Sequence, residues 1–140
     1  MYSVRVKYVM EKAKRLVAPP ETTVTKAAKL MAKKNVGAVM VVEGKKLVGI
    51  FTERDVVTRV VAERLDPDAT MISAVMTPDP FTVPPDEVFG RALLLMHDHS
   101  FRHVPVVDNG EPVGIVSSRK ALDPEMEEFV SETQRRLSLR

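Results

Sequence analysis

The chain contains the same sequence pattern twice, and this duplication limits the folds that it can adopt. Two apolar runs around a polar turn, VGAVMVV at 36–42 and LVGIFT at 47–52, recur as FRHVPVV at 101–107 and PVGIVS at 112–117. Gly49 recurs as Gly114, and most other matches keep this spacing without a gap. A copy of about sixty residues is too short to bury a comfortable core alone. We therefore expect two copies packed as one unit with internal pseudo-twofold symmetry.

Hydrophobic spacing predicts the same elements in both copies. In the first copy it predicts a helix that begins near Thr22 or Thr23, a hairpin around the turn at 43–46, and a second helix from Thr52. In the second copy, Asn109-Gly110 predicts the tight hairpin turn. The residues expected on the buried helix faces are Val24, Ala27, Ala28 and Met31; then Val56, Val57, Val60 and Val61; and, in the second copy, Phe89, Ala92, Leu93 and Met96.

Two further segments carry apolar residues that their own copy does not obviously cover. The run 93–96 is apolar on more than one helix face, which favours a second cover such as another subunit. From Pro124 onward, Met126, Phe129 and Leu137 follow helical spacing, with acids early and Arg135-Arg136 late, as the helix dipole favours. We expect the tail to be a docking helix.

Composition excludes several classes of protein. The chain has no cysteine, so disulfides, thiolate nucleophiles and cysteine-ligated metals are excluded. No apolar run is long enough to span a membrane, and the first residues lack the apolar segment of a secretory signal, so we expect a cytoplasmic protein. We find neither a Gly-x-Ser-x-Gly elbow nor a phosphate loop, and we do not expect an enzyme.

Charge and histidine content do not favour nucleic-acid or metal binding. The net charge is only +2, and the basic clusters at 12–15, 45–46 and 135–136 have no aromatic residues between them to stack on bases. His97 and His99 are two residues apart on a helix and point in different directions, while His103 begins a strand. We expect solvated basic faces and no metal site.

The segments VGIFTERD at 48–55 and RHVPVVD at 102–108 strongly resemble CBS domains, and two copies occur at tandem spacing with Val-Met before each. The resemblance implies an α+β fold of two βαββα repeats, which often form a flat dimer and bind adenosine-containing ligands in the clefts between repeats. We divide the chain into a first repeat at 1–66, a second at 67–122 and the docking helix at 123–140. Such modules usually regulate another protein, which here would be a separate chain.

Thr52-x-x-Asp55 is the first candidate for ligand binding. Its structural explanation is a capping box, in which each residue bonds the other's backbone N–H. In the resembled family, the threonine lies near phosphate or ribose and the aspartate holds the ribose. A carboxylate can accept both hydroxyls of a ribose. Arg54 and Arg119 recur in both copies and are either solvated or in contact with phosphate or another subunit.

The second copy differs where the ligand would bind. It has Ser117 and Lys120 in place of Thr52 and Asp55, so the ribose acceptor is lost. It also has Arg102-His103 where the first copy has Gly37-Ala38. The resemblance therefore implies one competent cleft, formed by Ile50, Thr52, Arg54, Asp55, Phe81, Thr82, Ala92, Arg102 and His103. It implies a weaker second cleft, formed by Leu16, Val17, Ala27, Gly37, Ala38, Ser117, Arg119 and Lys120.

These observations predict a non-enzymatic, ligand-sensing module, with AMP as the first choice of ligand and ADP or ATP as others. We expect a homodimer and no catalytic cofactor. One alternative is a dimerisation scaffold without a ligand, in which Thr52 and Asp55 only cap a helix. Others are binding of S-adenosylmethionine or a nicotinamide dinucleotide, and nucleic-acid binding suggested only by the sequence pI near 9.0.

Overall fold

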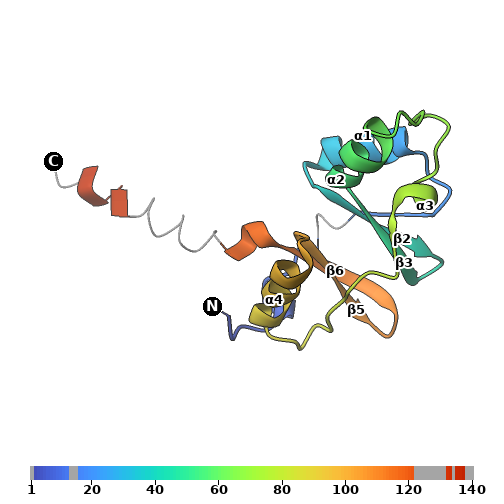
Figure 1. The fold of residues 1–140 in the computed structure, drawn as a ribbon. Coiled ribbons are helices and arrows are strands. Elements are labelled where there is room, and N and C mark those ends of the chain that lie inside the picture. The colour runs from blue at the N-terminus through green and yellow to red at the C-terminus, as the bar shows by residue number, and fades with distance from the viewer. Residues whose placement is uncertain (1, 13–15, 122–131, 134, 138–140) are drawn as a thin grey trace.

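The computed structural model describes residues 2–12, 16–121, 132–133 and 135–137. Figure 1 shows two halves, one with α1, α2, α3, β2 and β3, the other with α4, β5 and β6. This is the α+β arrangement of two repeats that the sequence predicts. With η for 3-10 and π helices, the elements are η1 Val6–Tyr8, β1 Val17–Ala18, α1 Val24–Lys34, β2 Ala38–Glu43, β3 Lys46–Thr52, α2 Glu53–Asp55, η2 Val56–Val61, α3 Ile72–Val75, β4 Thr77–Pro78, α4 Phe89–His99, β5 His103–Asp108, β6 Glu111–Ser117 and η3 Ser118–Ala121.

The strand pairing repeats between the halves. In the first, β1 runs parallel to β2, and β2, β3 and β4 pair antiparallel in that order. In the second, the β5–β6 hairpin is flanked by two single bridges, Val83 parallel to Val106 and Glu11 antiparallel to Ile115. These bridges occupy the places of β1–β2 and β3–β4 in the first half. The internal symmetry therefore extends to the register of the strands.

The opening segment of each repeat packs in the core of the other repeat. Val6, which is fully buried, belongs to the core of the second half, and Figure 1 shows the blue N-terminal segment beside α4. Ile72 and Val75, which open the second repeat, belong to the core of the first half. We call these two segments, 2–12 and 71–78, the exchanged lead-ins. Each repeat thus contributes residues to both cores.

Two glycines allow the exchanged lead-ins to approach the sheets. A Cβ on Gly114 would lie 2.6 Å from the sulfur of Met10, and a Cβ on Gly49 would overlap the sulfur of Met76. Both glycines lie in the second strand of a hairpin, at equivalent places in the two repeats. The sequence Val-Gly-Ile recurs because each methionine needs the space left by a missing side chain.

The ends of the first long helices also correspond. Thr23, one of the two predicted starts, caps α1 by accepting a hydrogen bond from the N–H of Lys26 at 3.2 Å. Asn35 ends α1 and Ser100 ends α4, both in the left-handed conformation with φ of 54° and 57°. Leu94 on α4 is 49% exposed, so the second cover predicted for this helix is not supplied by the described part of the chain.

The prediction for the helix after Thr52 was partly wrong. Val60 is buried, but Val57 and Val61 are 62% and 67% exposed rather than on the same buried face. After Asp55 the helix continues as the π-helical η2, in which the N–H of Ala62 donates to Val57 O at 2.9 Å. The wider π turn changes which side chains share a face, and α-helical spacing cannot show this.

Most of the predicted docking helix lies outside the described residues. Its described parts, 132–133 and 135–137, are helical, with a 2.9 Å ion pair between Arg136 and Glu132 and with Leu137 61% exposed. No helix among the described residues has both the length and the apolar character needed to cross a membrane.

Candidate functional site

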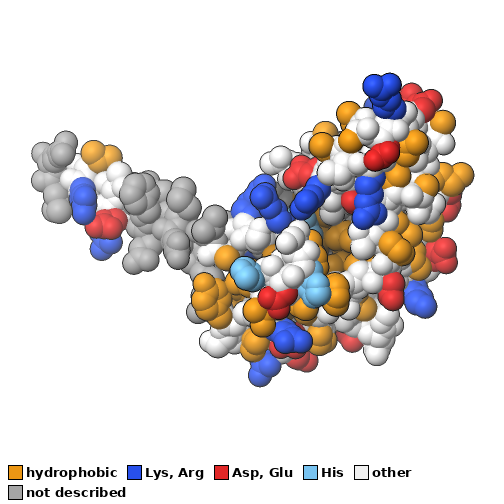
Figure 2. All heavy atoms as spheres, in the orientation of Figure 1, with side chains coloured by type: hydrophobic (Ala, Val, Ile, Leu, Met, Phe, Trp, Pro, Cys, Tyr) orange, Lys and Arg blue, Asp and Glu red, His pale blue; other side chains and the backbone are white. Residues whose placement is uncertain are grey.

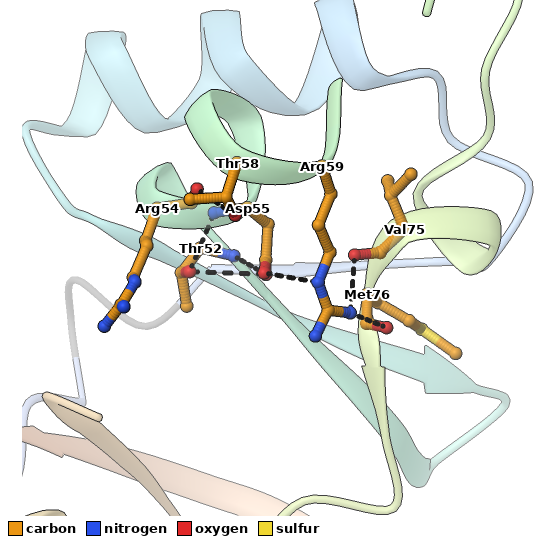
Figure 3. Close-up of polar contacts among 7 residues, drawn as sticks. All are labelled: Thr52, Arg54, Asp55, Thr58, Arg59, Val75 and Met76. Atoms are coloured by element: carbon orange, nitrogen blue, oxygen red, sulfur yellow. Dashed lines mark hydrogen bonds and ion pairs between the residues drawn. The ribbon is translucent and has the colours of Figure 1, made fainter. Parts of the chain in front are cut away.

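Thr52 and Asp55 form the capping box that the sequence allows. Thr52 ends β3, and its N–H donates to Oδ2 of Asp55 at 2.9 Å, while the N–H of Asp55 donates to Thr52 Oγ1 at 3.4 Å. Figure 3 shows the two side chains turned toward each other at the start of α2. Asp55 is only 8% exposed. Its carboxylate therefore caps the helix whether or not it also binds a ligand.

Arg59 occupies the other oxygen of the same carboxylate. Its Nε lies 3.6 Å from Asp55 Oδ1, and its Nη1 donates to the carbonyl oxygens of Val75 at 3.3 Å and Met76 at 3.0 Å (Figure 3). Arg59 thus connects the helix start of the first repeat to the exchanged lead-in of the second. A ribose at Asp55 would have to share the carboxylate with these partners.

Several other residues predicted for the first cleft make contacts that do not involve Asp55. Arg54 donates to the carbonyl of Ser100 at 3.3 Å, in the other half. The ring of Phe81 stacks on His99, with 4.2 Å between centroids, and on Phe101. Ile50 is buried in β3 and Thr82 is exposed.

Ala92 was wrongly assigned to the first cleft. It is fully buried in the core of the second half, so it has no surface to offer a ligand. The prediction placed it there by family resemblance, whereas its position on the apolar face of α4 explains its burial.

A cavity of about 350 Å³ lies at the junction of the two repeats. It brings together Arg102 and His103, expected in the first cleft, with Ser117, Arg119 and Lys120, expected in the second. We call this cavity the basic pocket. Figure 2 shows Lys and Arg side chains gathered where the two halves meet. Its lining residues are Glu11, Asn35, Val36, Gly37, Ala38, Glu53, Arg102, His103, Ile115, Ser117, Ser118, Arg119 and Lys120.

Two equivalent backbone bonds shape the basic pocket. The N–H of Glu53 donates to the carbonyl of Gly37, and the N–H of Ser118 donates to the carbonyl of Arg102, both at 3.0 Å. Each bond joins the start of one hairpin to the end of the same hairpin. The symmetry brings the starts of β2 and β5 together, so Arg102 and His103 face residues of both repeats.

The electrostatics of the basic pocket centre on His103. Burial lowers the pKa of His103 below its ordinary value of 6.5. The Glu53 carboxylate opposes this shift, while the charges of Arg119 and Arg102 add to it. The histidine is therefore neutral at pH 7, and the fixed positive charge comes from Arg102, Arg119 and Lys120.

Two residues predicted for the second cleft are core residues, because their side chains fill the first half. Leu16 is 7% exposed and Ala27 is fully buried. Val17 is 44% exposed but lies on β1 and does not line the basic pocket. The other residues predicted for that cleft all line the basic pocket: Gly37, Ala38, Ser117, Arg119 and Lys120.

Sequence reasoning missed the acidic residues of the basic pocket and the role of Arg59. Glu53 is equivalent to Ser118 in the second repeat. The comparison of the two repeats that identified Lys120 could therefore also have identified Glu53. Glu11 belongs to an exchanged lead-in, whose crossing is not visible in the sequence. Arg59 lies four residues after Asp55, which is the ordinary spacing for an ion pair on a helix. Among the described residues, no three His, Cys, Asp or Glu side chains gather as metal ligands would.

The repeats and their connection identify the family. The sequence profile of the CBS domain matches residues 6–62 and 72–124. The chain is 42% identical over 111 residues to the CBS domain-containing protein CBSCBSPB3 of Arabidopsis thaliana, a match that covers 79% of this chain and 20% of that protein. This chain is a tandem pair of CBS domains and belongs to that family. It spans about a fifth of the length of the plant proteins that it matches.

Solved structures of similar chains share the fold. The CBS domain protein PAE2072 from Pyrobaculum aerophilum, complexed with AMP, is 31% identical with a TM-score of 0.77, covering 84% of this chain and 89% of that one. The CBS domain pair of protein MJ0100, in complex with 5-methylthioadenosine and S-adenosyl-L-methionine, is 29% identical with a TM-score of 0.76, covering 84% and 96%. Both neighbours hold adenosine-containing molecules.

Proposed function

We propose that this CBS pair is a non-enzymatic regulatory module that binds an adenine nucleotide, AMP first, in the basic pocket. The observation that carries the proposal is the convergence of Arg102, Arg119 and Lys120 on one cavity between the repeats. Guanidinium and ammonium groups are the side chains best suited to a phosphate. The hydroxyls of Ser117 and Ser118 add donors beside them.

The size and lining of the basic pocket agree with this ligand. A volume of about 350 Å³ lies within the range of small-molecule sites. Val36 and Ile115 provide apolar surface for a base. Charge-assisted hydrogen bonds contribute about 1.5 to 3 kcal/mol each, so two or three of them with a buried base give an affinity on the order of micromolar. The similar structures in complex with AMP and with S-adenosyl-L-methionine support the proposal that the ligand contains an adenosyl group.

Calorimetry with AMP, ADP, ATP and S-adenosylmethionine tests the proposal, and Asp55→Ala shows which cleft is used. We expect AMP to bind, and to bind equally well to Asp55→Ala, because Asp55 caps α2 and does not line the basic pocket. That variant keeps the Thr52 cap but loses the bond from the Thr52 N–H to the Asp55 carboxylate, and becomes about 1 kcal/mol less stable. A large loss of AMP affinity in Asp55→Ala would instead support the first cleft, with Asp55 on the ribose. No binding of any of the four compounds would favour a scaffold without ligand.

Affinity for AMP should increase as the pH falls from 8 to 7, a range in which the phosphate stays mostly a dianion. His103 is neutral in the empty pocket because burial lowers its pKa, and a phosphate dianion nearby would raise it again. Binding then takes up a proton, and linkage requires tighter binding at lower pH. Calorimetry in two buffers of different ionisation enthalpy at pH 7 measures this uptake. The uptake should be smaller in His103→Asn, and equal uptake in both proteins would show that His103 does not take up the proton. A phosphate among cations releases a proton on binding, so it cannot be the source of an uptake.

We further propose that two chains associate and that a separate protein is regulated. An apolar groove of about 400 Å³ lies between α1 and η2, lined by residues that include Val24, Ala28 and Val60. The exposed Val57 and Val61 belong to η2, one of the two helices that form this groove. Exposed apolar surface of this kind is typical of contact sites between proteins. Native mass spectrometry of the purified chain would report the number of subunits and any retained nucleotide.

A further inference from the structure

Glu53 introduces a negative charge among the basic groups of the proposed nucleotide site. It is the first residue of α2, and its carboxylate lies against Gly37, where a Cβ would be 2.9 Å from Glu53 Oε1. The same Cβ would be 3.4 Å from Cε1 of His103. Because Gly37 has no side chain, Glu53 and His103 approach each other across it. The carboxylate is close enough to raise the pKa of His103 against the effect of burial.

The charges that line the basic pocket nearly balance. Arg102, Arg119 and Lys120 contribute three positive charges, and Glu11 and Glu53 contribute two negative ones, which leaves +1 with His103 neutral. A phosphate monoester carries about −1.5 to −2. Each additional phosphate adds negative charge, and the lining residues of this pocket include no further cation to balance it. The charge balance therefore suits one phosphate better than three.

The fold itself does not require a carboxylate at this position. Ser118 occupies the equivalent place in the second repeat, and its N–H makes the same 3.0 Å bond to a hairpin carbonyl as that of Glu53. The backbone bond is thus independent of the side chain. The carboxylate of Glu53 faces the basic pocket from the first repeat, while the matching serine lines the same pocket from the second.

We propose that Glu53 determines how many phosphates the site accepts, by repelling the second and third phosphates of ADP and ATP. This inference depends on the proposed function, since it concerns the same pocket. In the empty protein the carboxylate is a counter-charge for the basic groups. The attraction of the three cations for a monophosphate exceeds its repulsion by the Glu53 carboxylate. A triphosphate carries more negative charge, so the carboxylate repels it more strongly.

Calorimetry of adenosine, AMP and ATP with the wild-type protein and Glu53→Gln tests this. Removing one negative charge near a dianion should tighten AMP binding about tenfold, should tighten ATP binding by a larger factor, and should leave adenosine unchanged. Glu63→Gln makes the same change of charge outside the basic pocket and should leave the ratio of the AMP and ATP affinities as it is in the wild type. The gain in Glu53→Gln should shrink at high salt because salt screens exposed charges.

The outcomes distinguish this inference from the proposed function. If the wild type binds AMP but Glu53→Gln has the same ratio of AMP to ATP affinity, the role of Glu53 is wrong and the nucleotide site remains. If neither protein binds adenosine, AMP or ATP, both proposals fail together. Thermal unfolding of the two variants without ligand confirms that each is folded. Glu53→Ser, which copies the residue of the second repeat, should reproduce the result of Glu53→Gln.

Discussion

Arg102→Glu should weaken AMP binding about a hundredfold. The change replaces a positive charge in the basic pocket with a negative one, so the phosphate loses an attraction and gains a repulsion. Two unit charges 4 Å apart interact by about 1 kcal/mol even at the dielectric constant of water, and the phosphate carries at least about 1.5 negative charges. A change of two charge units at Arg102 therefore costs about 3 kcal/mol, which is a factor of about a hundred in affinity.

Arg102 is suited to this test because its backbone, and not its side chain, makes the structural contact. The carbonyl of Arg102 accepts the N–H of Ser118, and the side chain is exposed. We therefore expect the folded state to survive the substitution. Arg91→Glu on α4 makes the same change of charge outside the basic pocket and should bind AMP like the wild type. Equal affinity of Arg102→Glu and Arg91→Glu for AMP would show that the phosphate lies elsewhere.

Val6→Asp should destabilise the protein by about 4 kcal/mol. Val6 is fully buried and packs in the core of the second half, although it belongs to the first repeat. An aspartate there either buries an unpaired charge or pulls the lead-in out of the core, and both lower the free energy of unfolding strongly. Chemical denaturation measures the effect.

The matched control lies two residues away in the same short helix. Tyr8 is 72% exposed, so Tyr8→Asp should change the free energy of unfolding by about 0.5 kcal/mol or less. Ile72→Asp places the same charge in the core of the first half, at the equivalent lead-in, and should resemble Val6→Asp. If Val6→Asp were as stable as Tyr8→Asp, the N-terminal lead-in would not be part of the second core.

The repeat in the sequence predicted the fold because local patterns were sufficient for it. Apolar spacing located α1, α4 and both hairpins, and the recurrence of Gly49 as Gly114 placed the two halves in equivalent roles. The exchange of the lead-ins was not predicted. Each lead-in is a short apolar segment that would fit either core, and only tertiary packing decides between them.

The grouping of the candidate site residues also depends on tertiary packing. The sequence comparison assigned Arg102 and His103 to one cleft and Ser117, Arg119 and Lys120 to the other, whereas all five line the basic pocket. They meet in one pocket because the starts of β2 and β5 and the ends of both hairpins line the same cavity. The capping role of Asp55 was visible from spacing alone, because capping needs only neighbours in the sequence.

Because the lead-ins are exchanged, the two repeats cannot be separated into independent folding units. Cutting the chain between the two sequence repeats would leave each fragment carrying a piece that belongs to the other fragment's interior. Such fragments could complete their folds only by recombining, so a single CBS unit released from this chain would tend to pair with another copy rather than remain alone.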